Sequence, residues 1–582
     1  MSKLIPVTPG VARVAADTFG SVEAARSSMD RGRHRSGMDG LEHRVISISD
    51  LHVGVGTDPL TGHADVTDDW RPLQQIQLFR LLGRQWARAA GDDPSLAKLS
   101  DLQSPSNVDR DTVRRAPQPD YQLTLNLNGD VFELMQATQP RAGHPFPDGF
   151  DGGGPRTTPA NTLVKLNQIW QGQPEFFQTL ALHLALGHHV DFLPGNHDRD
   201  LWNDLVWSGQ LEVDGKELLG MESILRSEMK GFGLTDREAD SALERVRRLP
   251  FAVYGDSWFD HGHHEDPFNR TRRPYREVLG DTKPHDEMPQ AFGDYGVRDG
   301  YDALERKVPS LTERYHDPRA FLDAAWQAPQ SLVGAVRGFL KATQKQYHDS
   351  SAEADAATRL EDASSLVDAM PEIVDMLNQH RPPEERLTPD QVKTGLQNIE
   401  KATATPLYSM LGSGANLFRR IGALLKAQKQ THESHRERKL DALFEQFGIS
   451  NLVQGHTHEA ADQSFVNADG HRLRYVNTHT WMDQSGRLGP VSATWGENGR
   501  GVKVLDIGKD SDGRVWSRGR LGVVRDATGE VTPGTLIESI PEVSDKELER
   551  ARVIFEKSKR GRNRDGPVWK QAPLGEGRRR KV

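Results

Sequence analysis

The chain has 582 residues, which at roughly 150 residues per domain predicts two or more domains, or one domain with large insertions. It contains no cysteine, and this excludes disulfides, thiolate zinc sites, iron–sulfur clusters and thiol nucleophiles. The formal net charge of −9 disfavours nucleic acid as a partner without excluding it, because nucleic-acid-binding domains usually carry a basic face.

Neither end of the sequence has the pattern of a membrane anchor. Residues 1–43 are polar and lack the apolar core of a secretory signal, and no stretch of the sequence reaches the roughly 18 apolar residues of a membrane span. We therefore expect no transmembrane segment and a cytoplasmic protein. Residues 541–582 form a basic tail with the runs KSKRGRNR and GRRRKV, and such tails are more often solubilising ends than docking sites for an anionic partner.

Two segments in the first quarter of the chain predict buried strands that end in polar residues. In HRVISISDLH, residues 43–52, apolar residues alternate with serines before Asp50 and His52. The segment YQLTLNLNGD, residues 121–130, repeats this pattern and ends in Asp130. Between them, LQQIQLFRLLGRQWARAA has the apolar spacing of a helix.

The next two predicted strands also end in polar residues. A helix closed by Gly187 precedes a short strand at 190–193, which runs into the sequence GNHD at 195–198. The segment FAVYGDSWFDHGHH, residues 251–264, predicts a strand pair or one long strand that ends at His261.

The fifth predicted strand lies in FGISNLVQGHTH, where a helix ends at Gly448 and the strand ends at Gly455. His456 and His458 then occupy successive same-side positions. Two neutral imidazoles buried together would leave ring nitrogens that need partners. A metal ion supplies a partner to both, so this pair predicts a metal site.

Five strand ends thus carry residues of the metal-binding type. In α/β sheets, ligands collect beyond the carboxyl ends of the strands, so the five ends converge if their strands share a sheet. Because cysteine is absent, the ligands are oxygen and nitrogen atoms, which suit Mn, Fe, Zn or Ni.

The whole set of motifs resembles the signature of the calcineurin-like metallophosphoesterases. The resemblance covers the motif-bearing strands between about residues 44 and 481. It implies an α/β fold, a four-layer αββα sandwich, with two divalent metal ions as cofactors. The motifs that carry it are Asp50-x-His52, Gly129-Asp130, Gly195-Asn196-His197-Asp198, His261 and Gly455-His456-Thr457-His458.

The resemblance also assigns the metal ligands. Asp130 stands alone at its strand end and would bridge the two ions. The first ion would be held together with Asp50, His52 and His458. The second would be held together with Asn196, His261 and His456. His261 is preferred to His263 because members of the family place this ligand directly before a glycine.

In this family the histidine that matches His197 binds no metal, and it stabilises the transition state or protonates the leaving oxygen. Such a histidine needs an acceptor that fixes its tautomer. Glu133 stands where phosphoprotein phosphatases have an aspartate in this role, and Asp198 is the alternative. We therefore expect His197, Glu133 and Asp198 to be the catalytic residues.

The activity implied is hydrolysis of a phosphodiester, pyrophosphate or phosphomonoester bond by a metal-bridging hydroxide, with a phosphorylated small molecule as substrate. The stretch GDVFEL departs from the Gly-Asp-x-Val-Asp-Arg-Gly run of protein serine/threonine phosphatases. It is closer to bacterial UDP-diacylglucosamine pyrophosphatases, which commonly have arginine at the position of His197. The alternative is a catalytically silent binding module that acts through its insertion and basic tail, against which the intact set of ligands argues.

The predicted domain organisation surrounds the motifs with long extra segments. An N-terminal extension (1–43) and the basic tail (541–582) flank a discontinuous core at 44–265 and 441–540. Residues 266–440 form a helical insertion with helix starts at Asp317 and Thr388, which is either a bundle with its own core or a cap over the metal site. Arg199 and the run NRTRRPYR follow motifs closely enough to reach a substrate phosphate, although a solvated run of charges is the more frequent outcome. The stretch YVNTHTWMD resembles the family's closing strand, with His479 in place of a glycine.

Overall fold

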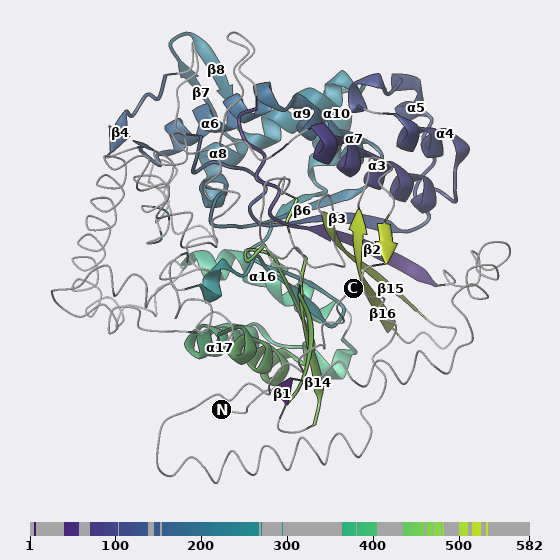
Figure 1. The fold of residues 1–582 in the computed structure, drawn as a ribbon, viewed down its shortest axis with the longest axis vertical. Coiled ribbons are helices and arrows are strands. Elements are labelled where there is room, and N and C mark those ends of the chain that lie inside the picture. Colours follow the sequence, from purple (N-terminus) through teal and green to yellow (C-terminus); the bar gives the residue numbers. More distant parts are fainter. Residues whose placement is uncertain are drawn as a thin grey trace, which may run out of the picture.

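The computed structural model shows a mixed α/β fold with two large mixed β-sheets and helices packed on them (Figure 1). The basic tail, most of the N-terminal extension and most of the insertion lie outside the described residues, as do His479, Asp317 and the arginines of NRTRRPYR. The structure describes residues 5–6, 40–56, 70, 72–102, 104–137, 145–151, 154–266, 269, 291, 294, 364–379, 381–403, 435–458, 461–467, 470–478, 480–481, 500–509, 515–524 and 531–533.

The larger sheet has seven strands in the order β17-β16-β15-β2-β3-β6-β9. β2, β3, β6 and β9 are parallel, and β15, β16 and β17 extend the sheet antiparallel from the edge of β2. The carboxyl ends of β2, β3 and β6 therefore lie side by side at one end of the sheet. The strands are β2 (Leu41–Ile48), β3 (Gln122–Asn128), β6 (His189–Leu193), β9 (Val246–Arg248), β15 (Arg500–Lys509), β16 (Val515–Val524) and β17 (Val531–Pro533).

The smaller sheet has six strands in the order β1-β13-β14-β12-β11-β10. β11, β12 and β14 are parallel, and the other pairings are antiparallel. Gly255, with φ of +60°, makes the tight turn between β10 and β11. The strands are β1 (Ile5–Pro6), β10 (Ala252–Tyr254), β11 (Ser257–Phe259), β12 (Asn451–Gln454), β13 (Ala461–Val466) and β14 (Arg472–Asn477).

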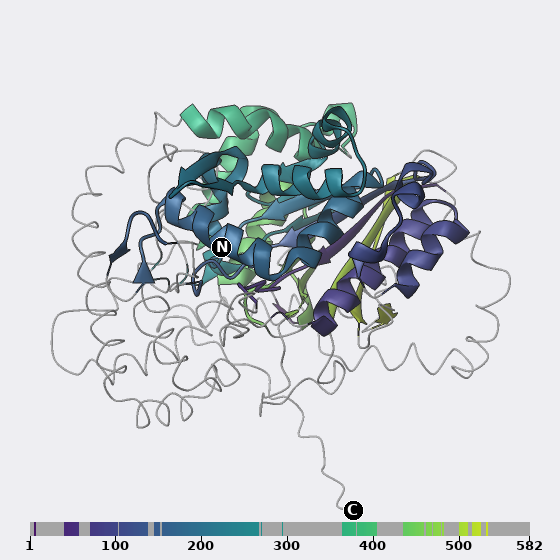
Figure 2. The same cartoon turned by 90° about the horizontal axis from the view of Figure 1, so that it is seen from above.

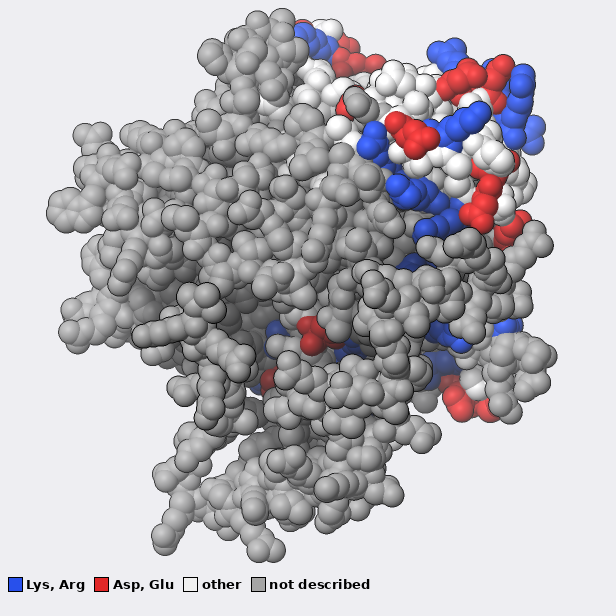
Figure 3. Space-filling view, turned by 45° about the vertical axis from the view of Figure 1, so that its right-hand side comes forward, with Lys and Arg blue, Asp and Glu red and all other residues white. Residues whose placement is uncertain are grey.

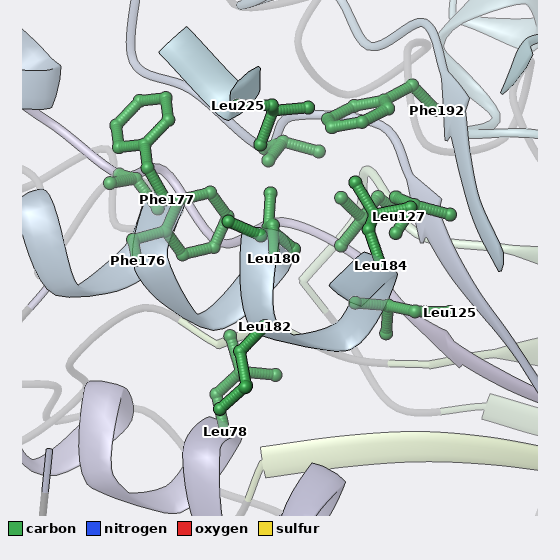
Figure 4. Packing of buried hydrophobic residues seen from close by; sticks show 14 of the residues in the cluster. Leu78, Leu125, Leu127, Phe176, Phe177, Leu180, Leu182, Leu184, Phe192 and Leu225 are labelled. Atoms are coloured by element: carbon green, nitrogen blue, oxygen red, sulfur yellow. The ribbon is translucent and has the colours of Figure 1, made fainter. Parts of the chain in front are cut away.

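Helices cover one face of the larger sheet and bury a large apolar cluster with it (Figure 4). Leu180 and Leu184 of α7 recur at helical spacing and face Leu125 and Leu127 of β3. Truncating such a leucine to alanine typically costs about 2–5 kcal/mol. In the view from above, the helical layer lies in front of the strands (Figure 2). They are α3 (Pro72–Ala89), α6 (Pro159–Gly172), α7 (Pro174–Ala185), α9 (Met221–Gly231) and α10 (Asp236–Leu243).

Shorter helices and two small hairpins lie between these elements along the chain. They are α4 (Pro94–Ala97), α5 (Arg110–Arg114), α8 (Asp204–Ser208), and the two small hairpins β4 (Phe150–Asp151) with β5 (Gly154–Pro155) and β7 (Gln210–Val213) with β8 (Lys216–Leu219).

A second apolar cluster joins the two sheets. Val45 and Leu505 come from the larger sheet, and Trp258, Leu452 and Tyr475 come from the smaller one. Because these side chains are buried together, the two sheets pack against each other.

Two helices of the predicted insertion belong to this second cluster. α16 (Ser364–Asn378) and α17 (Pro389–Thr403) contribute Ile373 and Leu396 to it, together with Phe447 from the helical residues 435–447. They lie on the other side of the sheets from α6, α7 and α9 (Figure 1). The described helices of the insertion are therefore packed on the core and do not form a bundle of their own.

The predicted strands form where expected. The five motif-bearing strands do not all share one sheet: β2, β3 and β6 lie in the larger sheet, and β11 and β12 lie in the smaller one. The predicted start of α17 is confirmed: Thr388 N donates to Gln391 Oε1 at 2.8 Å, and Gln391 N donates to Thr388 Oγ1 at 3.3 Å.

The described surface over the helical layer carries acidic and basic side chains that are interspersed (Figure 3). Arg226 pairs with Asp240 at 2.7 Å and Lys230 with Asp236 at 2.8 Å, both at exposed positions where such pairs contribute little stability. Among the described residues, no helix is both long and apolar enough to cross a membrane.

Candidate metal centre

The ends of five strands from the two packed sheets bring seven predicted ligands together. Asp50 and His52 follow β2, Asp130 follows β3, Asn196 follows β6, His261 follows β11, and His456 and His458 follow β12. Three groups of potential ligand atoms lie within 4.8 Å of one another: Asp50 with His52 and His458, His52 with Asp130 and His197, and Asp130 with His261 and His456.

The backbone at this site is unusual. Seven described residues other than glycine have a positive φ, and five of them are predicted ligands: Asp50 (53°), His52 (48°), Asp130 (51°), His456 (67°) and His458 (53°). A left-handed conformation is rare and costly for residues with a side chain, and it persists where the surrounding structure enforces it. Strain of this kind concentrates at functional sites.

Glycines next to the ligands allow the strand ends to approach one another. A Cβ atom on Gly129 would lie 2.5 Å from Cγ of His261, and one on Gly195 would lie 2.8 Å from Cγ of Asp130. These positions therefore have no room for a side chain, because a neighbouring ligand occupies the space.

Asp130 lies between the two halves of the site. Its Oδ2 atom is 3.7 Å from Nε2 of His52 on one side and 3.0 Å from Nε2 of His261 on the other. Its Oδ1 atom accepts a hydrogen bond from the backbone N–H of His197 at 2.8 Å. Asp130 thus shares its carboxylate between both groups of potential ligands.

Three of the histidines have one ring nitrogen held from outside the site. His52 Nδ1 lies 2.7 Å from Glu133 Oε2, His261 Nδ1 lies 3.0 Å from the carbonyl oxygen of Asn128, and His456 Nε2 lies 3.0 Å from Asp266 Oδ2. Ligating histidines typically use such an outer acceptor to fix the tautomer and the ring orientation.

The inward-facing atoms provide the test of whether a metal fits. Nε2 of His52, Nε2 of His261 and Oδ1 of Asn196 are buried and have no hydrogen-bond partner within the described part of the chain. Nε2 of His261 is close to Asp130 Oδ2, but the two atoms make no hydrogen bond of acceptable geometry. Buried polar atoms are nearly always satisfied, so these three orphaned atoms require an explanation. Divalent cations that take nitrogen and oxygen ligands fit this arrangement.

Asp50 connects the two histidines of the last motif. The backbone N–H of His456 lies 3.0 Å from each oxygen of Asp50, and Nε2 of His458 lies 3.1 Å from Asp50 Oδ1. Burial alone would raise the pKa of the Asp50 carboxyl, but the imidazoles of His261 and His458 outweigh it and lower the pKa to about 2. Asp50 is therefore an anion at neutral pH.

Glu133 contacts His197. Its Oε1 atom lies 2.8 Å from His197 Nδ1, while Oε2 is the acceptor for His52, so one carboxylate orients both histidines. Burial opposes a charge on His197, but the charges of Glu133 and Asp130 outweigh it and raise the pKa of His197 to about 10. The His197 side chain is 17% exposed.

Asp198, the alternative residue predicted to fix the tautomer of His197, contacts other groups. Its carboxylate accepts hydrogen bonds from the backbone N–H groups of Gly195 at 2.8 Å and Val131 at 2.6 Å. It thereby ties the loop after β6 to the loop after β3. Burial, reinforced by the charge of Asp130, raises the pKa of Asp198 to about 6. Of the two predicted carboxylates, Glu133 is the one that touches His197.

Arg199 and two histidines next to His261 are buried and not solvated. Arg199 Nη1 donates to Asp294 at 2.9 Å, so this arginine is not placed to reach a substrate phosphate. His263, the alternative to His261, is buried with its ring centroid 5.5 Å from that of His261, and His264 is buried as well.

A buried ionic network behind His261 was not predicted. Lys439, from the helical residues 435–447, lies 2.6 Å from Asp260 Oδ2 and also contacts Glu265. Gln454 Nε2 donates to Asp260 Oδ1 at 2.7 Å and to Glu265 Oε2 at 2.8 Å. This network fixes the loop that carries His261 against β12. The sequence signal was the acidic residues on both sides of the histidines in DHGHHED.

Comparison of the chain with family profiles, with curated proteins and with solved structures finds no match.

Proposed function

We propose that this protein is a calcineurin-like metallophosphoesterase that uses two divalent metal ions to hydrolyse a phosphodiester, pyrophosphate or phosphomonoester. A four-layer αββα sandwich is the architecture proposed with it. Its support is the apolar cluster that joins the two sheets, with α6, α7 and α9 on one side of them and α16 and α17 on the other.

The observation that carries the proposal is the set of close ligand atoms that includes the orphaned Nε2 atoms of His52 and His261 on either side of Asp130. One ion would be held by Asp50, His52 and His458, which form one such group, with Asp130 added as the bridge. The other would be held by Asp130, His261 and His456, which form a second group, with the orphaned Oδ1 of Asn196 added. His197 also lies close to His52 and Asp130, but its Nδ1 atom contacts Glu133, and we assign it to the proton transfer. Two such ions supply Lewis-acid activation of the phosphoester and of a water molecule.

The residues around these ligands have separate tasks. Glu133 accepts a hydrogen bond from Nδ1–H of His197 and, together with the charge of Asp130, favours the protonated imidazolium. The second ring proton of this imidazolium, on Nε2, would be donated to the leaving oxygen. Asp198 holds the backbone of Gly195 and Val131, so that Asp130 and Asn196 keep their relative positions.

The test is hydrolysis of an aryl phosphodiester and an aryl phosphomonoester, in parallel, by the full-length protein loaded with Mn²⁺. We expect turnover of at least one ester, two bound ions per chain, and loss of both ions and of activity in Asp130→Asn. Asp256→Asn is the matched control, because Asp256 is a partly buried carboxylate that binds Ser450 and Asn451, at the opposite end of β12.

Wild-type protein that binds two ions yet hydrolyses neither ester, nor a panel of nucleotides, would contradict the proposal. A catalytically silent binding module would then be the better description. Two ions retained in Asp130→Asn, with normal turnover, would refute the bridging role alone.

A further inference from the structure

His456 is held by a carboxylate that lies outside the seven ligands. Oδ2 of Asp266 is 3.0 Å from Nε2 of His456, and the Asp266 side chain is 5% exposed. An ionised carboxylate can only accept a hydrogen bond, so this 3.0 Å contact places the imidazole proton on Nε2. Asn269 Nδ2 lies 3.5 Å from the same nitrogen, at the limit of hydrogen-bond distance, and donates to Asp266 at the much shorter 2.8 Å. With the proton on Nε2, Nδ1 carries the lone pair that would serve an ion held with Asp130 and His261.

The position of Asp266 is itself fixed by a chain of contacts. Asn269 Nδ2 donates to the same Oδ2 atom of Asp266 at 2.8 Å. The carbonyl oxygen of Asn269 lies 3.5 Å from Nη2 of Arg199, and Nη1 of Arg199 donates to the buried Asp294 at 2.9 Å. The start of the insertion is thereby tied to the loop after β6, and Asp266 has little freedom to turn away from His456.

Asp266 acts through His456 and is not a ligand in its own right. Among the described residues, the group of close ligand atoms that contains His456 also contains Asp130 and His261 but not Asp266. The arrangement matches those of His52 with Glu133 and of His261 with the carbonyl of Asn128, in which the outer acceptor holds the nitrogen that faces away from the site.

We propose that Asp266 is a positioning residue for metal binding: it fixes the tautomer and the orientation of His456 and so strengthens the binding of one of the two ions. This inference rests on the proposed function, because it presupposes the metal site. It also assigns part of that site to the insertion, whose first residues would then support metal binding in addition to covering the core.

The experiment is a titration of metal-free, full-length protein with Mn²⁺, in which the number of bound ions and their affinities are measured by isothermal calorimetry and by the spectrum of free Mn²⁺. In Asp266→Ala we expect one of the two ions to bind roughly 10- to 100-fold more weakly, the range typical of lost outer partners. Asp266→Asn keeps an oxygen that can accept from Nε2–H, so it should restore a large part of the affinity.

Asp256→Asn is again the matched control, because its carboxylate binds Asn451 at 2.8 Å at the start of the strand that leads to His456. It should bind both ions as the wild type does. Two ions bound by Asp266→Ala with wild-type affinities would overturn the inference, and so would an equal loss in Asp256→Asn, because the effect would then be general destabilisation.

The two proposals fail separately. If the wild type binds two ions and Asp266→Ala loses affinity for one, the role of Asp266 stands even when no phosphoester is hydrolysed. If esters are hydrolysed and Asp266→Ala binds both ions normally, the proposed function stands and the role of Asp266 is refuted.

Discussion

Replacing Gly455 with alanine tests the geometry of the site without changing any charge. Gly455 precedes His456, and its φ lies outside the left-handed region, so an alanine backbone is compatible with this position. The added Cβ atom, however, would lie 2.7 Å from Cβ of Ser49 and closer still to Oδ2 of Asp50. The perturbation is therefore a local displacement of Asp50.

The size of this displacement follows from the contacts. Ordinary van der Waals contact begins near 3.4 Å, so the loop after β2 and the loop after β12 must separate by about 1 Å. A misplacement of about 1 Å in an active site can lower the rate by roughly 100-fold. We expect a loss of this order in turnover, together with weaker binding of the ion assigned to Asp50, His52 and His458.

The assay compares turnover of an aryl phosphoester and the Mn²⁺ content of Gly455→Ala with those of Gly448→Ala. Gly448 ends the helix of residues 435–447 with φ of +65° and has no atom within 4 Å of the added Cβ. Its substitution should lower the free energy of unfolding by about 1 kcal/mol while leaving metal binding and turnover near normal. If Gly455→Ala bound both ions with wild-type affinity and retained normal turnover, the close approach of the two loops would not matter for function, and the reasoning would be wrong.

Three further predictions concern single side chains. His197→Ala should retain both ions but lose roughly 10²- to 10⁴-fold in turnover of esters with poor leaving groups, with a smaller loss for good ones; an equal loss for both would exclude proton donation. Burial lowers the pKa of His183 to about 3, below its unfolded value near 6.5, so this residue's contribution to stability is complete above pH 6.5 and is lost as the pH falls towards 3. In urea unfolding, the free energy of unfolding should fall by roughly 2 kcal/mol between pH 7 and pH 5 because of His183. If His183→Gln lost as much stability over this pH range as the wild type, His183 would not be the cause. Burial lowers the pKa of Lys503 to about 7, against 10.5 in the unfolded chain, so the free energy of unfolding should rise with pH between these two values. Lys503→Met removes the buried amine and should raise the free energy of unfolding at pH 7 by up to roughly 4 kcal/mol. A variant less stable than the wild type at pH 7 would contradict this prediction.

The sequence predicts local features well because they depend on neighbouring residues. Alternation of apolar residues located β2 and β3, Gly187 marked the end of α7, and Thr388 with Gln391 marked the start of α17. Each of these signals reflects backbone geometry within a few residues.

Features that depend on distant segments were not predictable in the same way. Which motif strands belong to which sheet depends on which edges pair, and β11 and β12 pair with each other and not with β6. Arg199 looked like a phosphate-binding residue because its partner Asp294 is 95 positions away. Lys439 and Asp266 likewise acquire their roles only when the two ends of the insertion meet the site.

The strained residues explain how the site holds its shape. Left-handed conformations cost about 1–3 kcal/mol each, so the loops after β2 and β3 need contacts that offset this cost. The backbone provides them: Asp50 N donates to the carbonyl of Gly129 at 3.0 Å, and His52 N donates to the carbonyl of Asp130 at 2.9 Å. From the segment that follows β14, Trp481 N donates to the carbonyl of Asp50 at 3.0 Å. Each loop is therefore fixed by the main chain of another, and side chains that point inward from such loops are oriented before any ligand arrives.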